Sequence, residues 1–459
     1  MSNSDPEQLL STTWSLCPSC FAKIPASRVA RGDDVYLSKK CPEHGLVETI
    51  IWRGPPDYRS WAGSRASAPR VIPNTVIERG CPFDCGLCPD HGLPTCCALL
   101  EVTQRCDIGC RFCFADSGGI ANDPSKEVLE GRLRMLLAGE QSCNLQLSGG
   151  EPTVRDDLPE ITAMARSMGF QFIQLNTNGL RLARDLPYLK KLKAEGISCV
   201  FLQFDGTEDE IYRKIRGRAL LSEKLKAIEH CAACDLGVVL VPTLIPGINV
   251  HNAGAIVRFA LQRLPAVRGV HFQPVSYFGR YPEPPTNWDR ITIPEIIRAV
   301  CEQTGGAVKQ ESFKAARSEN PYCSFHANFI LMPEGELVPV TNHDPAACDC
   351  RPKKLKLGSA KESVARQWSF PKSAAGSCCS GSTSKSLDDL LDHILSHSFF
   401  ISGMAFQDIW NLDLERLKDC HVHVAAGNSK IVPFCAYNLT DQHGRPLYRP
   451  NSKTDVMQS

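Results

Sequence analysis

The stretch EVTQRCDIGCRFCFADS, residues 101–117, decides how the chain is interpreted. It places Cys106, Cys110 and Cys113 in a Cys-x3-Cys-x2-Cys spacing, directly after an apolar run at 98–102 that predicts a β-strand. Three thiolates on one short loop can each ligate one iron of a 4Fe–4S cluster, which leaves the fourth iron without a protein ligand. The amine and carboxylate of a bound small molecule can chelate that iron. On these cysteines alone, a zinc loop or a set of redox thiols stays open as an interpretation.

Strand-like and helix-like segments alternate from this loop onward. Apolar or alternating runs predict strands at 98–102, 143–151, 170–179, 197–206, 236–247 and 269–279. Helical periodicity predicts connecting helices at 124–140, 157–169, 186–196, 220–235 and 252–265. Repeated βα units imply a parallel sheet that is covered by helices. Six such units predict an α/β fold with a partial, open (β/α)6 barrel, whose chemistry lies at the carboxyl ends of the strands.

Short polar motifs stand at those strand ends. They are SGGEP, NTNG, QFDG and FQP, and the candidate binding residues within them are Gly149, Gly150, Glu151, Asn176, Gln203, Asp205 and Gln273. A lone GGEP or NTNG would be ordinary turn chemistry. In this order behind the three cysteines, the motifs resemble the radical S-adenosylmethionine (SAM) superfamily over roughly residues 98–280.

The resemblance implies a mechanism. A reduced cluster at Cys106, Cys110 and Cys113 would pass one electron to SAM, giving methionine and a 5′-deoxyadenosyl radical. That radical would abstract a hydrogen atom from an unactivated C–H bond, while the protein positions the reacting atoms and excludes competing reactions. The electron would come from a donor protein such as a flavodoxin or a ferredoxin.

The composition limits the other possibilities. The chain has 459 residues, 23 cysteines and a net charge of +1. Its first residues, MSNSDPEQLL, lack the basic and apolar regions of a signal peptide, so a reducing cytoplasm is expected. There, clustered cysteines favour metal or redox chemistry over disulfides. The charge balance predicts no nucleic-acid partner, and no apolar run has the length of a transmembrane segment.

Two cysteine groups precede the central loop. Cys17, Cys20, Cys41 and His44 form two knuckles with a spacing that suits tetrahedral zinc, although thiolates suit iron as well. The runs YLSKK and LVETIIW between and after them predict a small sheet, and together they form a rubredoxin-like module. Unpaired structural cysteines are the alternative interpretation.

The second group repeats the spacing of the central loop. Cys81, Cys85 and Cys88 could bind a second 4Fe–4S cluster or a zinc ion, with Cys96 or Cys97 as the fourth ligand. This triplet is not expected to bind SAM, because the strand and the GGEP motif follow residues 106–113 instead.

A finer resemblance spans almost the whole chain. The front segments CPSC, CPEHG and CPFDCGLCPDH and the tail segments LDLERLKDC and PFCAYN are similar to the radical SAM family that contains archaeal tetraether lipid synthase and proteins once labelled pterin methyltransferases. This resemblance implies a third cluster at Cys323, Cys420 and Cys435. The candidates for its fourth ligand are Cys348, Cys350, His421 and His423. Ordinary buried thiols are the alternative interpretation. Cys378 and Cys379, in a run of small residues, have no assigned use.

The sequence therefore predicts four parts. They are a rubredoxin-like module at 1–75, an auxiliary cluster loop at 76–97, the barrel at 98–300 and a C-terminal auxiliary-cluster and substrate domain at 301–459. The sharpest functional hypothesis is C–C coupling on a lipid-like substrate. Methyl or one-carbon transfer to a heterocycle is the alternative enzyme, and an iron–sulfur or zinc electron carrier or scaffold is the alternative of another class. The expected location is cytoplasmic, at the membrane periphery if the substrate is a lipid.

Overall fold

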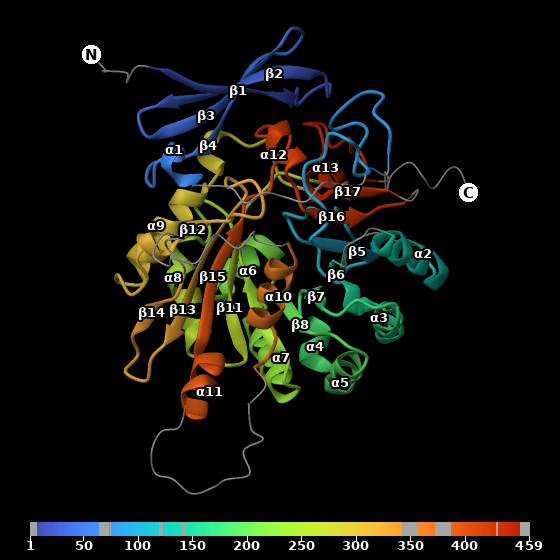
Figure 1. Ribbon diagram of the computed structural model, residues 1–459, viewed down its shortest axis with the longest axis vertical. Coiled ribbons are helices and arrows are strands. Elements are labelled where there is room, and N and C mark those ends of the chain that lie inside the picture. Colours follow the sequence, from blue (N-terminus) through green and yellow to red (C-terminus); the bar gives the residue numbers. More distant parts are fainter. Residues whose placement is uncertain are drawn as a thin grey trace, which may run out of the picture.

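The computed structural model describes residues 7–63, 73, 75–118, 123–138, 143–341, 357–371, 387–427 and 430–449. Cys348 and Cys350, proposed as fourth ligands, and Cys378 and Cys379, which have no assigned use, lie outside these ranges. Two sheets organise the described residues, a small one from the N-terminal segment and a large one from the rest of the chain (Figure 1).

The N-terminal sheet is an antiparallel meander with the strand order β1-β2-β3-β4. Its strands are β1 (Gln8–Leu16), β2 (Lys23–Arg31), β3 (Asp34–Cys41) and β4 (Gly45–Trp52), followed by the short helix α1 (Tyr58–Trp61). Inward-facing residues alternate with exposed ones along β3, which is the period-2 pattern of a half-buried strand. The predicted small sheet is confirmed, and β1 and β2 enlarge it.

Six parallel strands in the order β11-β9-β8-β7-β6-β5 form the centre of the large sheet. Their bounds are β5 (Cys97–Thr103), β6 (Asn144–Gly149), β7 (Ile173–Thr177), β8 (Cys199–Gln203), β9 (Gly237–Val241) and β11 (Val267–Pro274). The predicted strand at 236–247 is divided into β9 and β10 (Thr243–Leu244) by Pro242, which has no N–H for the ladder. The carbonyl of Pro242 accepts a hydrogen bond from the Gln273 N–H at 3.0 Å.

Helices connect these strands and cover one side of the sheet (Figure 1). They are α2 (Lys126–Leu137), α3 (Leu158–Ser167), α4 (Leu180–Arg184), α5 (Leu186–Ala194), α6 (Asp209–Arg216), α7 (Leu221–Ala233) and α8 (Ala253–Leu261). On β8, Val200 and Leu202 pack into the core under the helices, whereas Phe201 and Gln203 face the interior of the barrel. The predicted α/β barrel is thereby confirmed, with α4 and α6 as additional helices.

Residues after 300 extend the same sheet at both edges. Strand β15 (Ser398–Met404) is parallel to β11, and β16 (Val422–Ala425) is parallel to β5. Further antiparallel strands flank them: β13 (Ser324–Leu331), β12 (Lys314–Ala315), β14 (Leu337–Pro339) and β17 (Ile431–Pro433). The remaining helices are α9 (Ile293–Gln303), α10 (Leu357–Trp368), α11 (Leu387–His397), α12 (Leu414–Lys418) and α13 (Phe434–Asn438). Strands β12, β13 and β15 therefore lie beyond β11 at one edge of the barrel, and β16 and β17 lie beyond β5 at the other.

Buried polar contacts attach the N-terminal sheet to the C-terminal segment. Arg28 on β2 donates from Nε to Asp413 Oδ2 at 2.8 Å, and Thr13 donates to the other oxygen of the same carboxylate at 2.8 Å. The fully buried Lys39 donates to the Ile409 carbonyl at 2.6 Å. Because buried charges are costly unless paired, these contacts fix the position of the module on the body.

A buried ion pair ties the end of the described chain to the first barrel strand. Arg449 Nη2 lies 2.6 Å from Glu101 Oε1, with 8% and 7% of the two side chains exposed. We expect Arg449→Met to lower the free energy of unfolding by about 3–5 kcal/mol, because it leaves the Glu101 carboxylate buried without its partner. Urea unfolding measures this effect. The exposed pair Lys191–Glu160 is the control, and Lys191→Met should leave the unfolding midpoint nearly unchanged, because solvent screens that pair. Equal losses from both variants would contradict the prediction.

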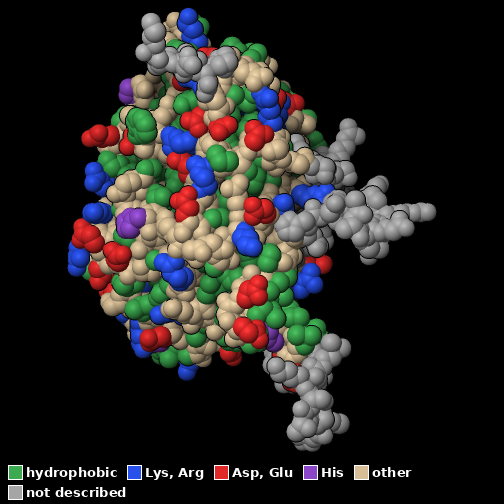
Figure 2. All heavy atoms as spheres, turned by 90° about the vertical axis from the view of Figure 1, so that its left-hand side faces the viewer, with side chains coloured by type: hydrophobic (Ala, Val, Ile, Leu, Met, Phe, Trp, Pro, Cys, Tyr) green, Lys and Arg blue, Asp and Glu red, His purple; other side chains and the backbone are tan. Residues whose placement is uncertain are grey.

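The face of the molecule in Figure 2 has no large patch of a single charge that would attract a charged polymer. Figure 2 shows positive and negative side chains interspersed over one face. Within the described part of the chain, no helix has the length and apolar character needed to cross a membrane.

Candidate active site and metal centres

A cavity of about 780 Å³ lies at the carboxyl ends of the barrel strands. The predicted cluster residues Cys106, Cys110 and Cys113 line it. So do most of the predicted binding residues, namely Gly149, Gly150, Glu151, Asn176, Gln203 and Gln273. The fold therefore brings residues from five strand ends to one space, although they lie up to 167 positions apart in the sequence.

The two glycines of GGEP hold the cysteine loop against the sheet. Gly149 has φ +134°, and a Cβ on it would lie 2.2 Å from the Thr103 carbonyl oxygen. A Cβ on Gly150 would lie 2.2 Å from the carbonyl oxygen of Arg105. The N–H of Gly150 donates to Thr103 at 2.8 Å, and that of Glu151 donates to Arg105 at 2.8 Å. Only glycine permits this approach, and it positions the residue immediately before Cys106.

Arg280 braces the other end of the loop. Its backbone forms an isolated antiparallel bridge with Cys113, through hydrogen bonds of 2.9 and 3.0 Å. Its guanidinium donates to the carbonyls of Cys110 at 2.9 Å and Ser117 at 3.0 Å. Sequence analysis missed this residue, because nothing in the motif FQPVSYFGR indicates which loop the arginine reaches.

Glu151 is fully buried and hydrogen-bonded within the protein. Its Oε1 accepts from the Thr153 N–H at 3.0 Å and the Thr177 hydroxyl at 2.6 Å, and its Oε2 accepts from the Asn178 N–H at 2.6 Å. Burial raises the pKa of this carboxyl, and these donors partly offset the rise. The side chain thus joins the ends of β6 and β7 as well as lining the cavity.

Asp205 lies behind the cavity wall and is fully buried. It pairs with Arg216, whose Nε is 2.6 Å from Asp205 Oδ2, and it accepts from the Gln203 amide. Arg216 itself lines the cavity and lies close to Cys110. Sequence analysis missed Arg216; the amphipathic run DEIYRKIR of α6 indicates a helix but not the partner of its arginine.

Lys224 is a second buried cation that sequence analysis missed. Its ammonium donates to the Gln203 side chain at 2.7 Å and to the Asn178 carbonyl. Burial lowers the pKa of Lys224 to about 8. It holds the ends of β7 and β8 in place from beneath Gln203.

The three central thiols fit the donor set of a cluster with one open iron. They stand on one loop at the cavity surface and are partly exposed, whereas cysteines such as Cys199 and Cys231 are enclosed in the core. Burial raises the pKa of Cys106 to about 12, so its thiol needs a bound cation to ionise at neutral pH. Thiolates are the usual ligands of iron–sulfur clusters.

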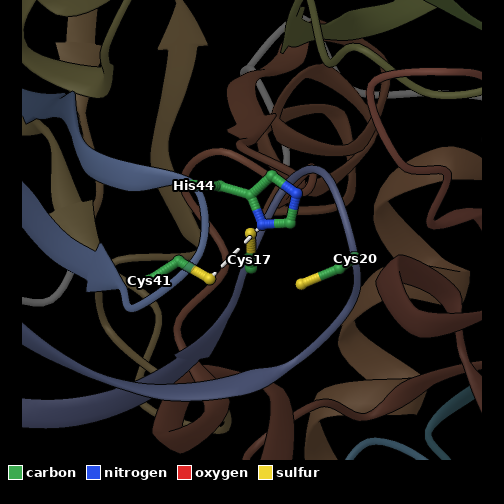
Figure 3. A group of neighbouring side chains, drawn as sticks. All are labelled: Cys17, Cys20, Cys41 and His44. Carbon is green, nitrogen blue, oxygen red and sulfur yellow. Dashed lines mark hydrogen bonds between the residues drawn. The ribbon is translucent and has the colours of Figure 1, made fainter.

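The N-terminal metal site is assembled as predicted. The ligand atoms of Cys17, Cys20, Cys41 and His44 all lie within 4.8 Å of one another. Cys17 and Cys20 come from the loop after β1, Cys41 is the last residue of β3, and His44 lies in the turn between β3 and β4 (Figure 3). His44 Nδ1 is 3.5 Å from Cys41 Sγ. Three thiolates and one imidazole in this arrangement fit a tetrahedral zinc or iron ion.

We expect Cys41→Ala to lose one metal ion per chain, because three remaining ligands hold a structural ion poorly. Elemental analysis of the purified protein gives the zinc and iron content and identifies the native metal. Cys301→Ala removes a thiol from α9, outside the ligand set, and should leave the metal content unchanged. Retention of the full metal content by Cys41→Ala would contradict the assignment.

The second cysteine loop is folded onto the C-terminal segment. Cys81, Cys85 and Cys88 are all buried, and they lie close enough for a charge on one thiol to affect the others. Burial raises the pKa of Cys81 to about 12. The N–H groups of Cys96 and Cys97 both donate to the His421 carbonyl, at 3.0 and 3.2 Å. Cys97 begins β5 and lines the cavity, as Cys96 does.

The three C-terminal cysteines also come together. Burial raises the pKa of Cys420, and the neighbouring thiols Cys435 and Cys323 add to that effect. The buried Arg416 donates to Cys323 Sγ at 3.5 Å. Cys323 directly precedes β13, Cys420 lies between α12 and β16, and Cys435 is in α13, so only the fold makes them neighbours.

Two of the fourth-ligand candidates have other contacts. His421 Nε2 lies 2.7 Å from Glu319 Oε2. His423 Nε2 lies 3.1 Å from His91 Nε2, and both rings are buried between the second loop and β16.

Known proteins resemble the chain in sequence. Residues 100–260 match the radical SAM superfamily, and residues 9–53 match the HMPTM N-terminal zinc ribbon domain. A protein of Methanocaldococcus jannaschii named 7,8-dihydro-6-hydroxymethylpterin dimethyltransferase is 35% identical over 93% of each chain. A probable GTP 3′,8-cyclase of Methanothermobacter marburgensis is 32% identical over 38% of this chain and 56% of its own.

Solved structures resemble the chain more distantly. Streptococcus suis SuiB bound to S-adenosylmethionine has 15% identity and a TM-score of 0.33, covering 41% of each chain. The hydrogenase maturase HydG of Carboxydothermus hydrogenoformans has 14% identity and a TM-score of 0.35, covering 48% of this chain and 53% of its own.

The cysteine loop, the GGEP motif and the parallel barrel define a radical SAM enzyme, which uses a 4Fe–4S cluster and SAM. Within that superfamily, the chain belongs to the family of the Methanocaldococcus jannaschii protein, which it matches over nearly the full length of both chains.

Proposed function

We propose that Cys106, Cys110 and Cys113 hold the cluster that cleaves SAM, and that substrate and SAM share the cavity of about 780 Å³. The observation that supports this is the common lining of the cavity by these cysteines, the GGEP residues and the interior of the barrel. When bound, the cluster would supply the electron that converts SAM to methionine and a 5′-deoxyadenosyl radical.

The protein's own residues have three tasks in this proposal. Arg280 keeps the cysteine loop at its position, with Arg216 beside Cys110. Asn176, Gln203 and Gln273 offer amide donors and acceptors to the polar parts of SAM. The cavity walls surround the radical and the substrate, which limits reaction of the radical with other C–H bonds.

We further propose that the product is a new carbon–carbon bond on a substrate with an extended apolar part. The inner end of the cavity supports this, because Phe201, Val241, Val364, Trp368 and Phe400 line it. The aromatic rings in this set pack closely, with 4.5 Å between the ring centres of Phe201 and Trp368. Such a surface suits alkyl chains, which gain free energy by leaving water.

Coupling two carbon atoms has a fixed balance. Each C–H hydrogen atom leaves as part of one 5′-deoxyadenosine molecule, and the two unpaired electrons left on carbon form the new bond. Each coupling thus consumes two SAM molecules and two electrons from an external reductant. We propose that two further sets of cysteines hold auxiliary clusters along the route of those electrons. The first set is Cys81, Cys85, Cys88 and Cys96, and the second is Cys323, Cys420 and Cys435.

The experiment is anaerobic reconstitution with iron and sulfide, reduction with dithionite and incubation with SAM and a lipid extract. We expect two 5′-deoxyadenosine molecules per coupled product, both measured by mass spectrometry. Coupled product without 5′-deoxyadenosine, or no cleavage of SAM at all, would overturn the proposal.

Methyl or one-carbon transfer to a heterocycle is a second candidate. The name of the Methanocaldococcus jannaschii relative and the polar wall of the cavity, with His271 and His326, favour it. The same incubation with 6-hydroxymethyl-7,8-dihydropterin distinguishes the two. S-adenosylhomocysteine together with a pterin heavier by one methyl group would support this candidate over coupling.

A further inference from the structure

One wall of the cavity has a polar cluster that the proposed SAM site does not use. It is built where β11, β13 and β15 lie side by side, with the segment before β16 next to it. Its members are His271, Glu319, Ser324, His326, Ser402 and His421, and each of them lines the cavity.

Glu319 is the centre of this cluster. Its Oε2 is 2.7 Å from His421 Nε2, its Oε1 accepts from the Ser324 hydroxyl, and 7% of its side chain is exposed. His271 Nδ1 is 2.9 Å from the Ser402 hydroxyl. The strand register places His326 beside Ser402. Imidazole and hydroxyl groups thus surround one buried carboxylate.

The carboxylate retains capacity for a further partner. Two carboxylate oxygens offer about four acceptor positions, and the two contacts of Glu319 occupy about half of them. Removing a carboxylate from water is costly unless hydrogen bonds or charges replace the water. A donor that enters the cavity would complete this replacement.

An apolar surface begins directly beside the polar wall. The ring of His271 lies 6.4 Å from that of Trp368, which in turn lies 5.9 Å from Phe400 in a stacked arrangement. A ligand that contacts both surfaces needs a hydrogen-bond donor next to an apolar body.

We propose that Glu319, held by His421 and Ser324, binds an uncharged N–H or O–H group of the substrate and rejects an anionic group at the same place. The inference rests on the proposed function, because it assumes that the substrate occupies this cavity. A ring N–H of a heterocycle and the free hydroxyl of a dialkylglycerol both have this chemistry. A phosphate ester lacks it, because its negative charge would meet the buried carboxylate.

The test uses the reconstituted holoenzyme with SAM and three probes. They are 6-hydroxymethylpterin, a 1,2-di-O-alkylglycerol and the phosphate ester of that alcohol, and the binding of each is measured directly by isothermal titration calorimetry. The pterin and the alcohol represent the two sources of the same donor group, so the probe that binds identifies the source. We expect the alcohol to bind about tenfold or more tightly than its phosphate ester, or the pterin alone to bind. Equal or better binding of the phosphate ester would overturn the inference.

Glu319→Gln is the matching variant. Its amide removes the charge and one acceptor, so we expect the dissociation constant of the bound probe to rise about tenfold or more. Glu334→Gln changes an exposed carboxylate after β13 and should leave binding unchanged. Iron content and the visible spectrum show whether Glu319→Gln retains its clusters. If it loses iron, the comparison of the alcohol with its phosphate ester in the natural protein still tests whether this wall rejects an anionic group.

The two proposals fail in different ways. If the natural protein does not form 5′-deoxyadenosine, the proposed function is wrong. If it does, and Glu319→Gln with a full iron content binds the probe as tightly as the natural protein, only the role of Glu319 is wrong.

Discussion

Replacing Cys106 by alanine is expected to abolish the formation of 5′-deoxyadenosine, down to the level of an assay without protein. The loop then offers two thiolates where the cluster needs three, and the iron that SAM would chelate is no longer held beside the GGEP residues. The measurement is 5′-deoxyadenosine by mass spectrometry after anaerobic reconstitution and reduction with dithionite. Iron per chain should fall by the content of one cluster, while the iron at the other sites stays.

Cys231→Ala is the matched control for this variant. Cys231 is fully buried on α7, and burial is the main cause of the raised pKa of its thiol. It therefore has the environment of a core residue. Its replacement should preserve both the iron content and the cleavage of SAM. Normal activity of Cys106→Ala would show that Cys106 does not hold the reactive cluster. Loss of activity in both variants would show that the effect is not specific to Cys106.

Replacing Gly149 by alanine is expected to have the second largest effect. The new Cβ would lie 2.2 Å from the Thr103 carbonyl oxygen, and φ +134° is a conformation that alanine rarely adopts. Backbone strain and overpacking together should cost roughly 2–5 kcal/mol of the free energy of unfolding. Because the clash pushes on the segment that leads into Cys106, cluster loading should fall as well. Urea unfolding and the visible spectrum of the reconstituted protein measure the two effects.

Gly131→Ala separates this local clash from the general effect of a methyl group. Gly131 lies within helix α2, and no atom stands within 4 Å of a Cβ at that position. Alanine there should stabilise the protein by about 0.5–1 kcal/mol, because it favours the helix. A Gly149→Ala protein with natural stability and full cluster content would show that the close approach of β6 to residues 103–105 is not needed.

Local sequence was sufficient for the features that depend on spacing. Cys106, Cys110 and Cys113 lie within eight residues, so one loop brings them together whatever the rest of the chain does. The knuckles of the N-terminal site are equally local, and a short meander closes the distance between them. Apolar runs likewise predicted all six central strands, since burial on both faces favours near-continuous hydrophobic segments.

Partners that lie far apart in the sequence could not be predicted. Arg216 and Lys224 appear as ordinary helix residues, yet they are buried cations beside Cys110 and Gln203. Asp205, expected beside the cofactor, stands behind the wall because Arg216 pairs with it. A charged residue has no periodic signal that names its partner, so only the folded chain reveals it.

The sequence by itself thus determined the class of chemistry, because ligand type and spacing on a single loop are local properties. Only the tertiary structure decided what surrounds that chemistry. Strands β13, β15 and β16 join a barrel whose first strand begins more than 200 residues earlier in the chain, and they bring Glu319 and His421 into the same cavity as the cysteine loop. Such contacts arise from packing between distant segments, where burial and hydrogen bonding select neighbours that no local pattern specifies.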